Sequence, residues 1–286
     1  MVGGFYKYIF RRKFVFDHHD LNPELFEAKF GHRGFLWKIL VFLERITFGV
    51  ADISIATNLS YARVAVQRGR MDPDRVFVVR SGPNLARVRE LPPDESWRNG
   101  RPHLVAYVGV IGEQEGIDLL LEAVKHITAS RQRSDIQFVI MGAGPNLEVL
   151  RHACAEMDLS PFVTFTGRVD DTTLFKVLST ADVCVNPDRP NAMNDMSTMN
   201  KIMEYMALGK PIVQFDLAEG RVSAQSASLY AQNTNTVDFG DKILELIDAP
   251  ERRREMGIYG RQRVRDELSW EHEEPKLIAA YDAVFK

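Results

Sequence analysis

Strand-like and helix-like hydrophobic patterns alternate along the second half of this chain. Short apolar runs are predicted to be strands at residues 104–110, 136–141, 162–166, 183–186 and 212–215. The segments between them repeat apolar residues at the three- and four-residue spacing of amphipathic helices. Regular alternation of this kind is typical of a parallel sheet with crossover helices. The pattern therefore predicts an α/β domain over residues 101–270.

The first part of the chain shows a shorter version of the same alternation. Strands are predicted at residues 14–20, 53–57 and 76–80, with a helical segment rich in large apolar residues over 21–49. The polar, proline-rich stretch up to Pro102 is typical of a linker. Residues 1–100 are thus predicted to be a separate, partial Rossmann-like domain plus linker, and 271–286 a C-terminal helix that returns to it.

The most informative segment is NAMNDMSTMNKIMEYMALGKPIVQFD, residues 191–216. A hydroxyl of Ser197 or Thr198 is expected to cap a helix that begins near Met199, because hydroxyl oxygens accept hydrogen bonds from first-turn amides. Gly209 is expected to end that helix, and Pro211 to open the next strand.

The first turn of this helix carries Asn200, Lys201 and Glu204. Free amides and the helix dipole favour an anion there. We therefore expect a phosphate site with an ammonium and a carboxylate beside it. The alternative interpretation is an amphipathic helix that leads into a strand and binds nothing.

Three further loops follow predicted strands. Residues 109–116 contain Gly109 and Gly112, whose backbone can approach a phosphate closely. Residues 142–145 form a tight strand-to-helix turn that includes Gly144, and residues 167–170 include Arg168 and Val169. The carboxyl ends of parallel strands are where doubly wound folds form sites.

Composition limits the functional classes. A net charge of −3 over 286 residues argues against general nucleic-acid binding. Cys154 and Cys184 have no metal-type spacing. No apolar run reaches the roughly 18 residues of a membrane span and no signal peptide is visible, which predicts a cytoplasmic protein. The basic and aromatic segment over residues 1–16 has two interpretations. It either lies on the anionic surface at the inner face of a membrane, or is a helix end that leads into a strand.

Glu204, Ala207, Gly209 and Pro211 resemble the second half of the donor-site signature of the family 4, or group 1, glycosyltransferases. Met196, with Asp195 beside it, stands where that signature has its first glutamate. The chain is similar to a subgroup associated with polysaccharide assembly. The resemblance implies a GT-B fold, in which two Rossmann-type domains face each other, with the first domain incomplete here.

The resemblance also implies roles for individual residues. In the family a histidine at the end of a strand like that predicted over residues 14–20 approaches the sugar, and His19 fits this place best, with His18 as the alternate. Family members commonly grip the diphosphate with basic residues at the positions of Val110 and Glu115, so Lys201 is the expected replacement. Predicted catalytic residues are His19, Asp195 and Lys201, and predicted donor-binding residues are Gly109, Gly112, Gly144, Arg168, Val169, Ser197, Thr198, Asn200, Lys201 and Glu204.

The implied function is transfer of a sugar from a nucleoside diphosphate sugar to a glycan or lipid-linked acceptor, with retention of configuration, in surface polysaccharide synthesis. No cofactor and no metal are expected, and Glu204 would hold the ribose hydroxyls. The alternatives are a non-catalytic nucleotide-sugar-binding subunit that needs a complementing N-terminal chain, and a GT-B epimerase or phosphorylase. The strand at 14–20 is expected to lack a partner on one side.

Overall fold

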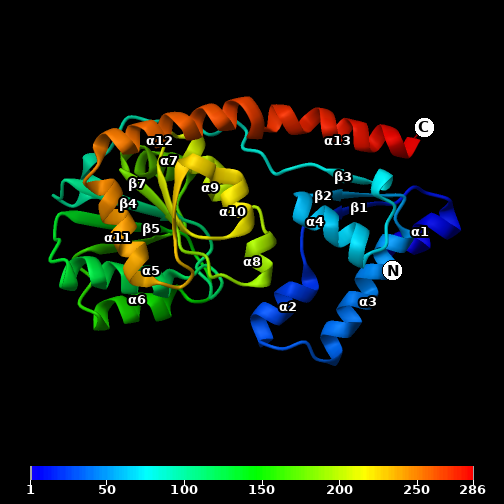
Figure 1. The fold of residues 1–286 in the computed structure, drawn as a ribbon, viewed down its shortest axis with the longest axis horizontal. Coiled ribbons are helices and arrows are strands. Elements are labelled where there is room, and N and C mark those ends of the chain that lie inside the picture. Colours follow the sequence, from blue (N-terminus) through cyan, green and yellow to red (C-terminus); the bar gives the residue numbers. More distant parts are fainter. Residues whose placement is uncertain (1, 286) are drawn as a thin grey trace. The chain divides into compact units, whose positions relative to one another are not determined.

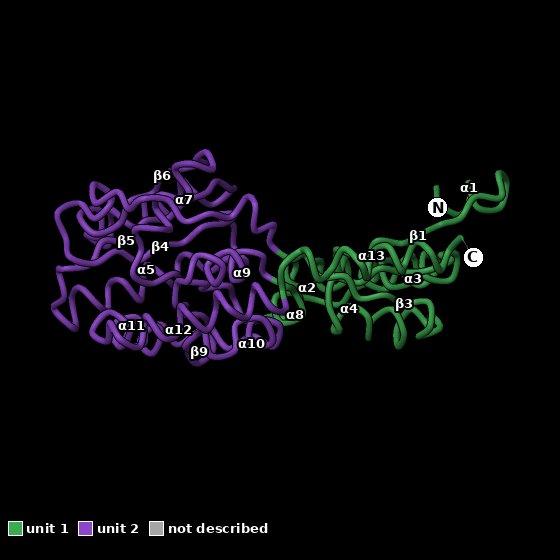
Figure 2. The backbone as a smooth tube through the Cα atoms, turned by 90° about the horizontal axis from the view of Figure 1, so that it is seen from above, with its two compact units in different colours: residues 1–82, 191–198, 268–286 green, residues 83–190, 199–267 purple. Residues whose placement is uncertain are grey.

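The computed structural model describes residues 2–285 and divides into two compact units. The first unit consists of residues 1–82, 191–198 and 268–286, and the second of residues 83–190 and 199–267 (Figure 2). Each unit contains its own parallel sheet. The chain is therefore α/β, with two Rossmann-like halves, as the alternation of patterns predicted (Figure 1).

The sheet of the first unit has the order β1-β2-β3. Its strands are β1 Val15–His18, β2 Ile53–Ala56 and β3 Val76–Val78. Within the described residues β1 pairs with β2 alone, in a register that places His18 opposite Ala56. The strand that ends in histidines thus lies at a sheet edge, as the sequence predicted.

The helices of this unit are α1 Val2–Phe10, α2 Asn22–Phe30, α3 Phe35–Val50, α4 Leu59–Arg63, α8 Ala192–Met196 and α13 Trp270–Phe285. The single helix expected over 21–49 is two, because Gly31 adopts a left-handed conformation with φ 71° and ends α2. Ala280 and Val284 of α13 pack against Ile53 and Ile55, so the C-terminal helix belongs to the first unit.

The sheet of the second unit has the order β6-β5-β4-β7-β8-β9. Its strands are β4 His103–Val108, β5 Ile136–Met141, β6 Val163–Gly167, β7 Val183–Asn186, β8 Ile212–Phe215 and β9 Ser228–Ala231. Five of them match the sequence prediction to within two residues. Strand β9 was missed, because its sequence SLYA is short and half polar and offers no apolar run.

Seven helices of the second unit are α5 Ile117–Lys125, α6 Leu147–Glu156, α7 Asp171–Thr180, α9 Asn200–Ala207, α10 Ala218–Ala224, α11 Thr236–Ile247 and α12 Pro250–Arg263. Helices α5, α6 and α11 pack against one set of alternating strand residues, such as Val105, Phe138 and Val213. Helices α7 and α9 contact strands β4, β7 and β8. Burial on both faces explains why these strands are continuously apolar.

The segment expected to be a linker up to residue 100 differs from that expectation, since residues 83–102 belong to the second unit. The amides of Leu91 and Asp94 donate to the hydroxyls of Ser179 and Thr180, over 3.0 and 2.8 Å. Arg98 forms an ion pair with Asp182. Polar, proline-rich composition therefore marked an irregular segment that side-chain hydrogen bonds hold against the end of α7.

Candidate functional site

The loops after β4, β5 and β6 meet at the carboxyl edge of the second sheet. Gly109 N donates to Met141 O over 3.1 Å, and Gly142 N donates to Gly167 O over 2.9 Å. An open cavity of about 360 Å³ lies at these loops and is lined by Val108, Gly109, Val110, Met141, Gly142, Ala143, Arg168, Val169, Asp171 and Leu174. Three of the residues predicted to bind the donor, Gly109, Arg168 and Val169, thus come together.

The glycines of these loops allow backbone to pack on backbone. Gly142 has a φ of 146°, and a Cβ there would lie 1.8 Å from Gly109 O. A Cβ on Gly144 would lie 2.2 Å from Ile111 O. The amide of Gly112 donates to Glu115 Oε2 over 3.1 Å. The amides of Gly109 and Gly112 are therefore already hydrogen-bonded, which differs from the phosphate cradle that the sequence predicted for them.

Lys201, on the first turn of α9, points into the protein. Its ammonium lies 2.9 Å from Asp188 Oδ1, 3.3 Å from the Tyr107 hydroxyl and 4.7 Å from the centre of the Tyr107 ring. The side chains of Lys201 and Asp188 are only 12% and 3% exposed. Burial lowers the pKa of Lys201, but the Asp188 carboxylate and Tyr107 raise it above its usual value. Lys201 is thus a buried, charged and already paired ammonium.

Glu115 adds a second carboxylate beside this pair. Burial raises the pKa of Glu115, the charge of Asp188 raises it further, and Lys201 opposes both effects. Glu115 also occupies the Gly112 amide. One ammonium and two carboxylates therefore meet under the 109–112 loop, at the position where the family resemblance expected cations.

Glu204 lies one turn further along α9 and is partly buried. Burial raises its pKa, Arg87 lowers it and Asp171 raises it, so the Arg87–Asp171 ion pair lies near this carboxylate. Asp171 also lines the 360 Å³ cavity. Arg168, at the same cavity, is exposed and makes no hydrogen bond or ion pair within residues 2–285. Glu204 and Arg168 thus place a carboxylate and a guanidinium near the same cavity, where each can contact a ligand.

The predicted cap of α9 is wrong. Met199 occupies the N-cap position and makes no side-chain cap. Ser197 Oγ instead donates to Met193 O over 2.7 Å, and Thr198 Oγ1 accepts from Asn58 Nδ2 over 3.0 Å. Residues 192–196 form the short helix α8, which the side chain of Asn191 caps and which ends at Ser197, so this segment does not supply the start of α9.

Four of the predicted site residues belong to the first unit: His19, Asp195, Ser197 and Thr198. Asp195 is half-buried on α8. His19 is exposed, and its Nε2 lies 3.0 Å from Asp17 Oδ1. The alternate, His18, is 1% exposed, packs against the rings of Phe48 and Tyr61, and has no hydrogen-bond partner on either ring nitrogen among the described residues. Burial lowers the pKa of His18 to about 4.

Sequence reasoning missed the polar residues that follow the middle strands. Asp188 and Tyr107 complete the Lys201 cluster, and the signal for Asp188 was the polar NPD sequence at the end of β7. Asn186 and Gln214 are register partners on β7 and β8, fully buried, with no side-chain hydrogen bond among the described residues. Such unsatisfied amides at a strand end indicate a site for a polar ligand or water.

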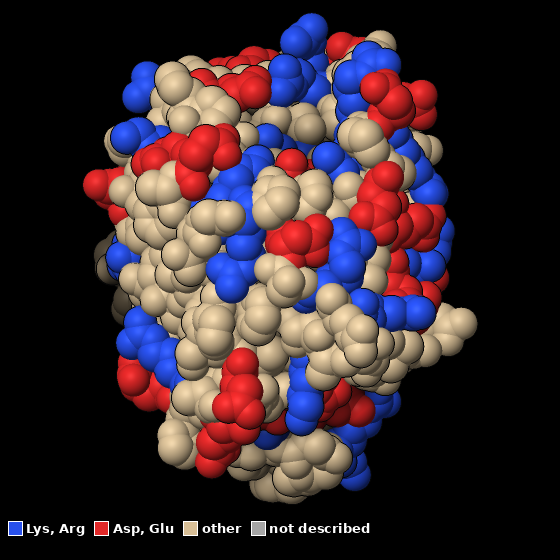
Figure 3. All heavy atoms as spheres, turned by 90° about the vertical axis from the view of Figure 1, so that its left-hand side faces the viewer, with Lys and Arg blue, Asp and Glu red and all other residues tan. Residues whose placement is uncertain are grey.

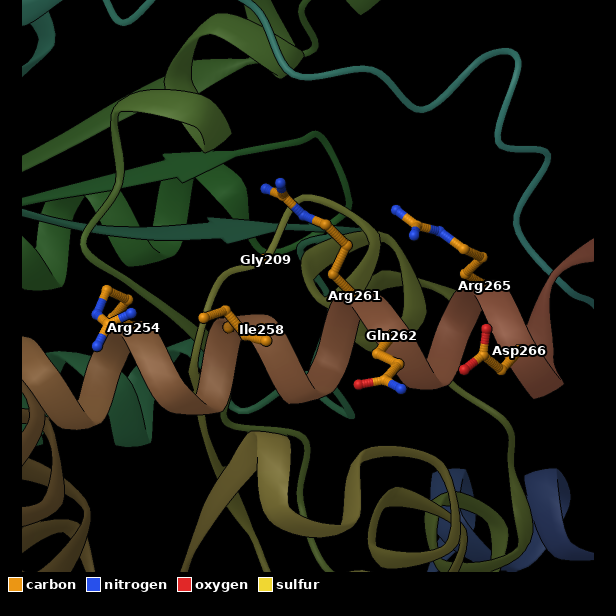
Figure 4. A pocket seen from close by; sticks show the side chains of 8 residues that line it. Gly209, Arg254, Ile258, Arg261, Gln262, Arg265 and Asp266 are labelled. Carbon is orange, nitrogen blue, oxygen red and sulfur yellow. The ribbon is translucent and has the colours of Figure 1, made fainter.

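A larger cavity, of about 490 Å³, lies along α12 and is lined by Gly209, Arg254, Gly257, Ile258, Arg261, Gln262, Arg265 and Asp266 (Figure 4). Arg261 there donates to Glu90 Oε2 and Leu208 O. We place the candidate site at the smaller cavity, because the chemistry-bearing loops and strand ends converge on it. Cationic and anionic side chains are interspersed on the face of Figure 3.

Neither a metal-ligand cluster nor a membrane-spanning helix occurs within residues 2–285. No group of three or more histidine, cysteine, aspartate or glutamate side chains is arranged to hold a metal ion there. In the same residues no helix combines the length and the hydropathy that crossing a membrane requires.

Residues 102–249, just over half of the chain, match the family model described as Glycosyl transferases group 1. The chain therefore belongs to that family. The match covers β4 to α11, which includes the cavity, the Lys201 cluster and Glu204.

Curated relatives agree with this family. The chain is 29% identical over 161 residues to a GDP-mannose-dependent monoacylated α-(1-6)-phosphatidylinositol monomannoside mannosyltransferase of Corynebacterium glutamicum, covering 55% of this chain and 41% of that protein. It is 28% identical to the α-maltose-1-phosphate synthase of Mycolicibacterium smegmatis, covering 93% of this chain and 72% of that protein. The first of these matches thus spans about two fifths of the relative's length.

Solved structures show the fold. Sucrose-phosphate synthase from Thermosynechococcus elongatus matches with a TM-score of 0.78 at 20% identity, over 99% of this chain and 71% of that one. HepE of Anabaena in complex with UDP matches with a TM-score of 0.79 at 14% identity, over 99% of this chain and 75% of that one. The fold is therefore that of GT-B glycosyltransferases, as the family resemblance predicted.

Proposed function

We propose that this chain is a glycosyltransferase that moves a sugar from a nucleoside diphosphate sugar to a glycan or lipid-linked acceptor. The observation that carries the proposal is the cavity at the carboxyl ends of β4, β5 and β6, which lies inside the segment that matches the family. Relatives named for GDP-mannose dependence, and a structural neighbour in complex with UDP, support a nucleotide-sugar donor. Polysaccharide or glycolipid assembly is the setting that the relatives' names favour.

The second unit supplies the proposed donor site. The base and ribose occupy the 360 Å³ cavity, where the backbone around Val169 contacts the base. Glu204 accepts hydrogen bonds from the ribose hydroxyls, because a carboxylate can accept from two hydroxyls at once. Arg168 supplies a cation that no other described residue neutralises.

The first unit supplies the proposed acceptor side, with His19 and Asp195 as its polar residues. Retention of configuration requires the acceptor to arrive on the face that the diphosphate leaves. Preorganised positive charge favours departure of the diphosphate, because it stabilises the negative charge that develops on the leaving group. Lys201 and Arg168 are the cations on the donor side.

Titration calorimetry with UDP, GDP and ADP, followed by incubation with labelled nucleotide sugars, tests the proposal. We expect one nucleotide to bind, and Glu204→Gln to weaken monophosphate and diphosphate alike, whereas the exposed control Glu122→Gln leaves both unchanged. NMR of the product reports its anomeric configuration. If no nucleotide binds the folded protein, the proposed function is wrong, and binding without any transfer to glycan or lipid acceptors favours the non-catalytic subunit.

A further inference from the structure

Helix α3 turns its apolar side outward. Its most exposed large residues recur at the spacing of one helix face, and they are Phe35, Leu36, Phe42, Leu43 and Ile46, with exposed fractions of 77, 59, 62, 42 and 40%. Phe48 alone is buried on this helix. An amphipathic helix of a globular protein ordinarily packs such a stripe against the protein core. The outward stripe therefore needs an apolar or interfacial neighbour.

Helix α1 extends the same surface. Phe5, Tyr6, Tyr8, Ile9 and Phe10 are each more than half exposed, and the helix has no buried residue. Its contact with α3 is nevertheless specific, because Lys7 donates to Val50 O and pairs with Asp52 Oδ1, over 2.7 and 2.9 Å. Helix α1 is thus fixed beside the end of α3 (Figure 1), and its aromatic side chains are exposed.

An apolar groove joins the two helices. It has a volume of about 210 Å³ and is lined by Gly4, Phe14, Ile46, Thr47 and Val50. A Cβ on Gly4 would lie 3.4 Å from Val50 Cγ1, so the glycine lets the two helices approach. Ile46 belongs both to this groove and to the outward stripe. The groove and the stripe are therefore one continuous apolar surface.

The charged border of this surface is positive. Arg11, Arg12 and Lys13 follow α1 and are exposed, and Lys38 and Arg45 lie seven residues apart along one edge of the α3 stripe. The one acidic residue of α3, Glu44, is turned toward Arg68 and its side chain is only 9% exposed. Helix α1 contains no acidic residue.

We propose that the outer face of α1 and α3 lies on an anionic lipid bilayer, with the aromatic side chains in the interface and the cations at the headgroups. Aromatic and aliphatic residues bordered by lysine and arginine are what such helices use. Each cation near an anionic surface adds about 1 kcal/mol. The proposal rests on the first unit alone, so its failure leaves the proposed nucleotide site in the second unit untouched.

Flotation of the full chain with vesicles tests the charge requirement. We expect binding to vesicles of phosphatidylcholine and phosphatidylglycerol, little binding to phosphatidylcholine alone, and loss of binding at high salt. Arg11→Ala, Arg12→Ala and Lys13→Ala together should weaken partitioning roughly a hundredfold. The control triple Lys125→Ala, Arg151→Ala and Lys176→Ala, of exposed cations in the second unit, should not change it.

A fluorescent probe tests which face inserts. Both native cysteines are buried, so a label can be directed to Phe42→Cys in α3 or to the control Val149→Cys in the second unit. An environment-sensitive dye should brighten with anionic vesicles only at position 42. No binding to anionic vesicles, or equal brightening at both positions, would overturn the proposal. So would self-association in solution that Phe42→Ser abolishes while vesicles fail to compete, since the face would then bind a second copy.

Discussion

Replacing Lys201 by methionine removes the only positive group within hydrogen-bond distance of the Asp188 carboxylate among the described residues. Asp188 is 2% exposed, so no solvent replaces the lost partner. The variant should therefore lose stability whether or not Lys201 contacts a ligand. Asp188→Leu should have a similar effect, because the neutral Tyr107 hydroxyl is then the only hydrogen-bond partner left to the buried Lys201 ammonium among the described residues.

The burial of this ion pair sets the expected loss of unfolding free energy. Breaking a buried ion pair by removing one partner costs about 3–5 kcal/mol, whereas replacing both partners by apolar residues of similar volume is often neutral. Each single variant should lose about 3–5 kcal/mol of unfolding free energy, and Lys201→Met with Asp188→Leu should return to within about 1 kcal/mol of the parent. The two single losses should thus be far from additive.

Urea unfolding of the parent, the two single variants and the double variant measures these free energies. Trp97 lies in the second unit, and Trp37 and Trp270 in the first, so a background with both of the latter changed to phenylalanine reports on the second unit. Additive losses, or a Lys201→Met variant as stable as the parent, would refute the ion-pair reasoning. The double variant also allows a clean binding test. If it binds nucleoside normally but nucleoside diphosphate poorly, Lys201 contacts the diphosphate.

Three further changes test other parts of the structure. Glu115→Gln should strengthen nucleoside diphosphate binding, measured by calorimetry, because it removes a negative charge from the loop. The matched control is Glu113→Gln at an exposed neighbouring position, and an unchanged affinity of the Glu115 variant would contradict the prediction. Gly142→Ala should abolish or strongly destabilise folding in thermal melts, because its Cβ would lie 1.8 Å from Gly109 O at a φ of 146°. Stability should fall as pH drops from 6.5 toward 4, by up to about 3 kcal/mol, because the depressed pKa of His18 favours proton uptake by the unfolded chain; His18→Phe should flatten that profile.

The fold could be predicted where burial imposes a pattern on the sequence. Strands β4, β5 and β8 are covered on both faces by helices, so their apolar runs were visible. Strand β9 lies at the sheet edge and contains Ser228 and Tyr230, so no such run marked it. The split between α2 and α3 depended on the left-handed conformation of Gly31, and the sequence prediction included the polar sequence between Gly31 and Gly34 in one helix.

The site was harder to predict because pairing of charges is a tertiary property. Position on a helix start drew attention to Lys201, but nothing in the local sequence showed that Asp188, thirteen residues earlier, would hold it inside the protein. The same holds for Ser197 and Thr198, whose hydroxyls suit a cap and instead bond within the first unit. Motif spacing identifies which residues meet, whereas competition among neighbours decides what each can still bind.

That competition bears on how a diphosphate would enter the second unit. Lys201 is neutralised by Asp188, and Glu115 brings a further negative charge to the same loop. An anion placed there gains little from this cluster unless Glu115 leaves Gly112 or takes up a proton, which its raised pKa favours. Arg168, unpaired among the described residues, is the cation at the cavity that can meet a phosphate without first breaking an ion pair. Donor affinity should therefore depend on Arg168 more than the family signature alone implies.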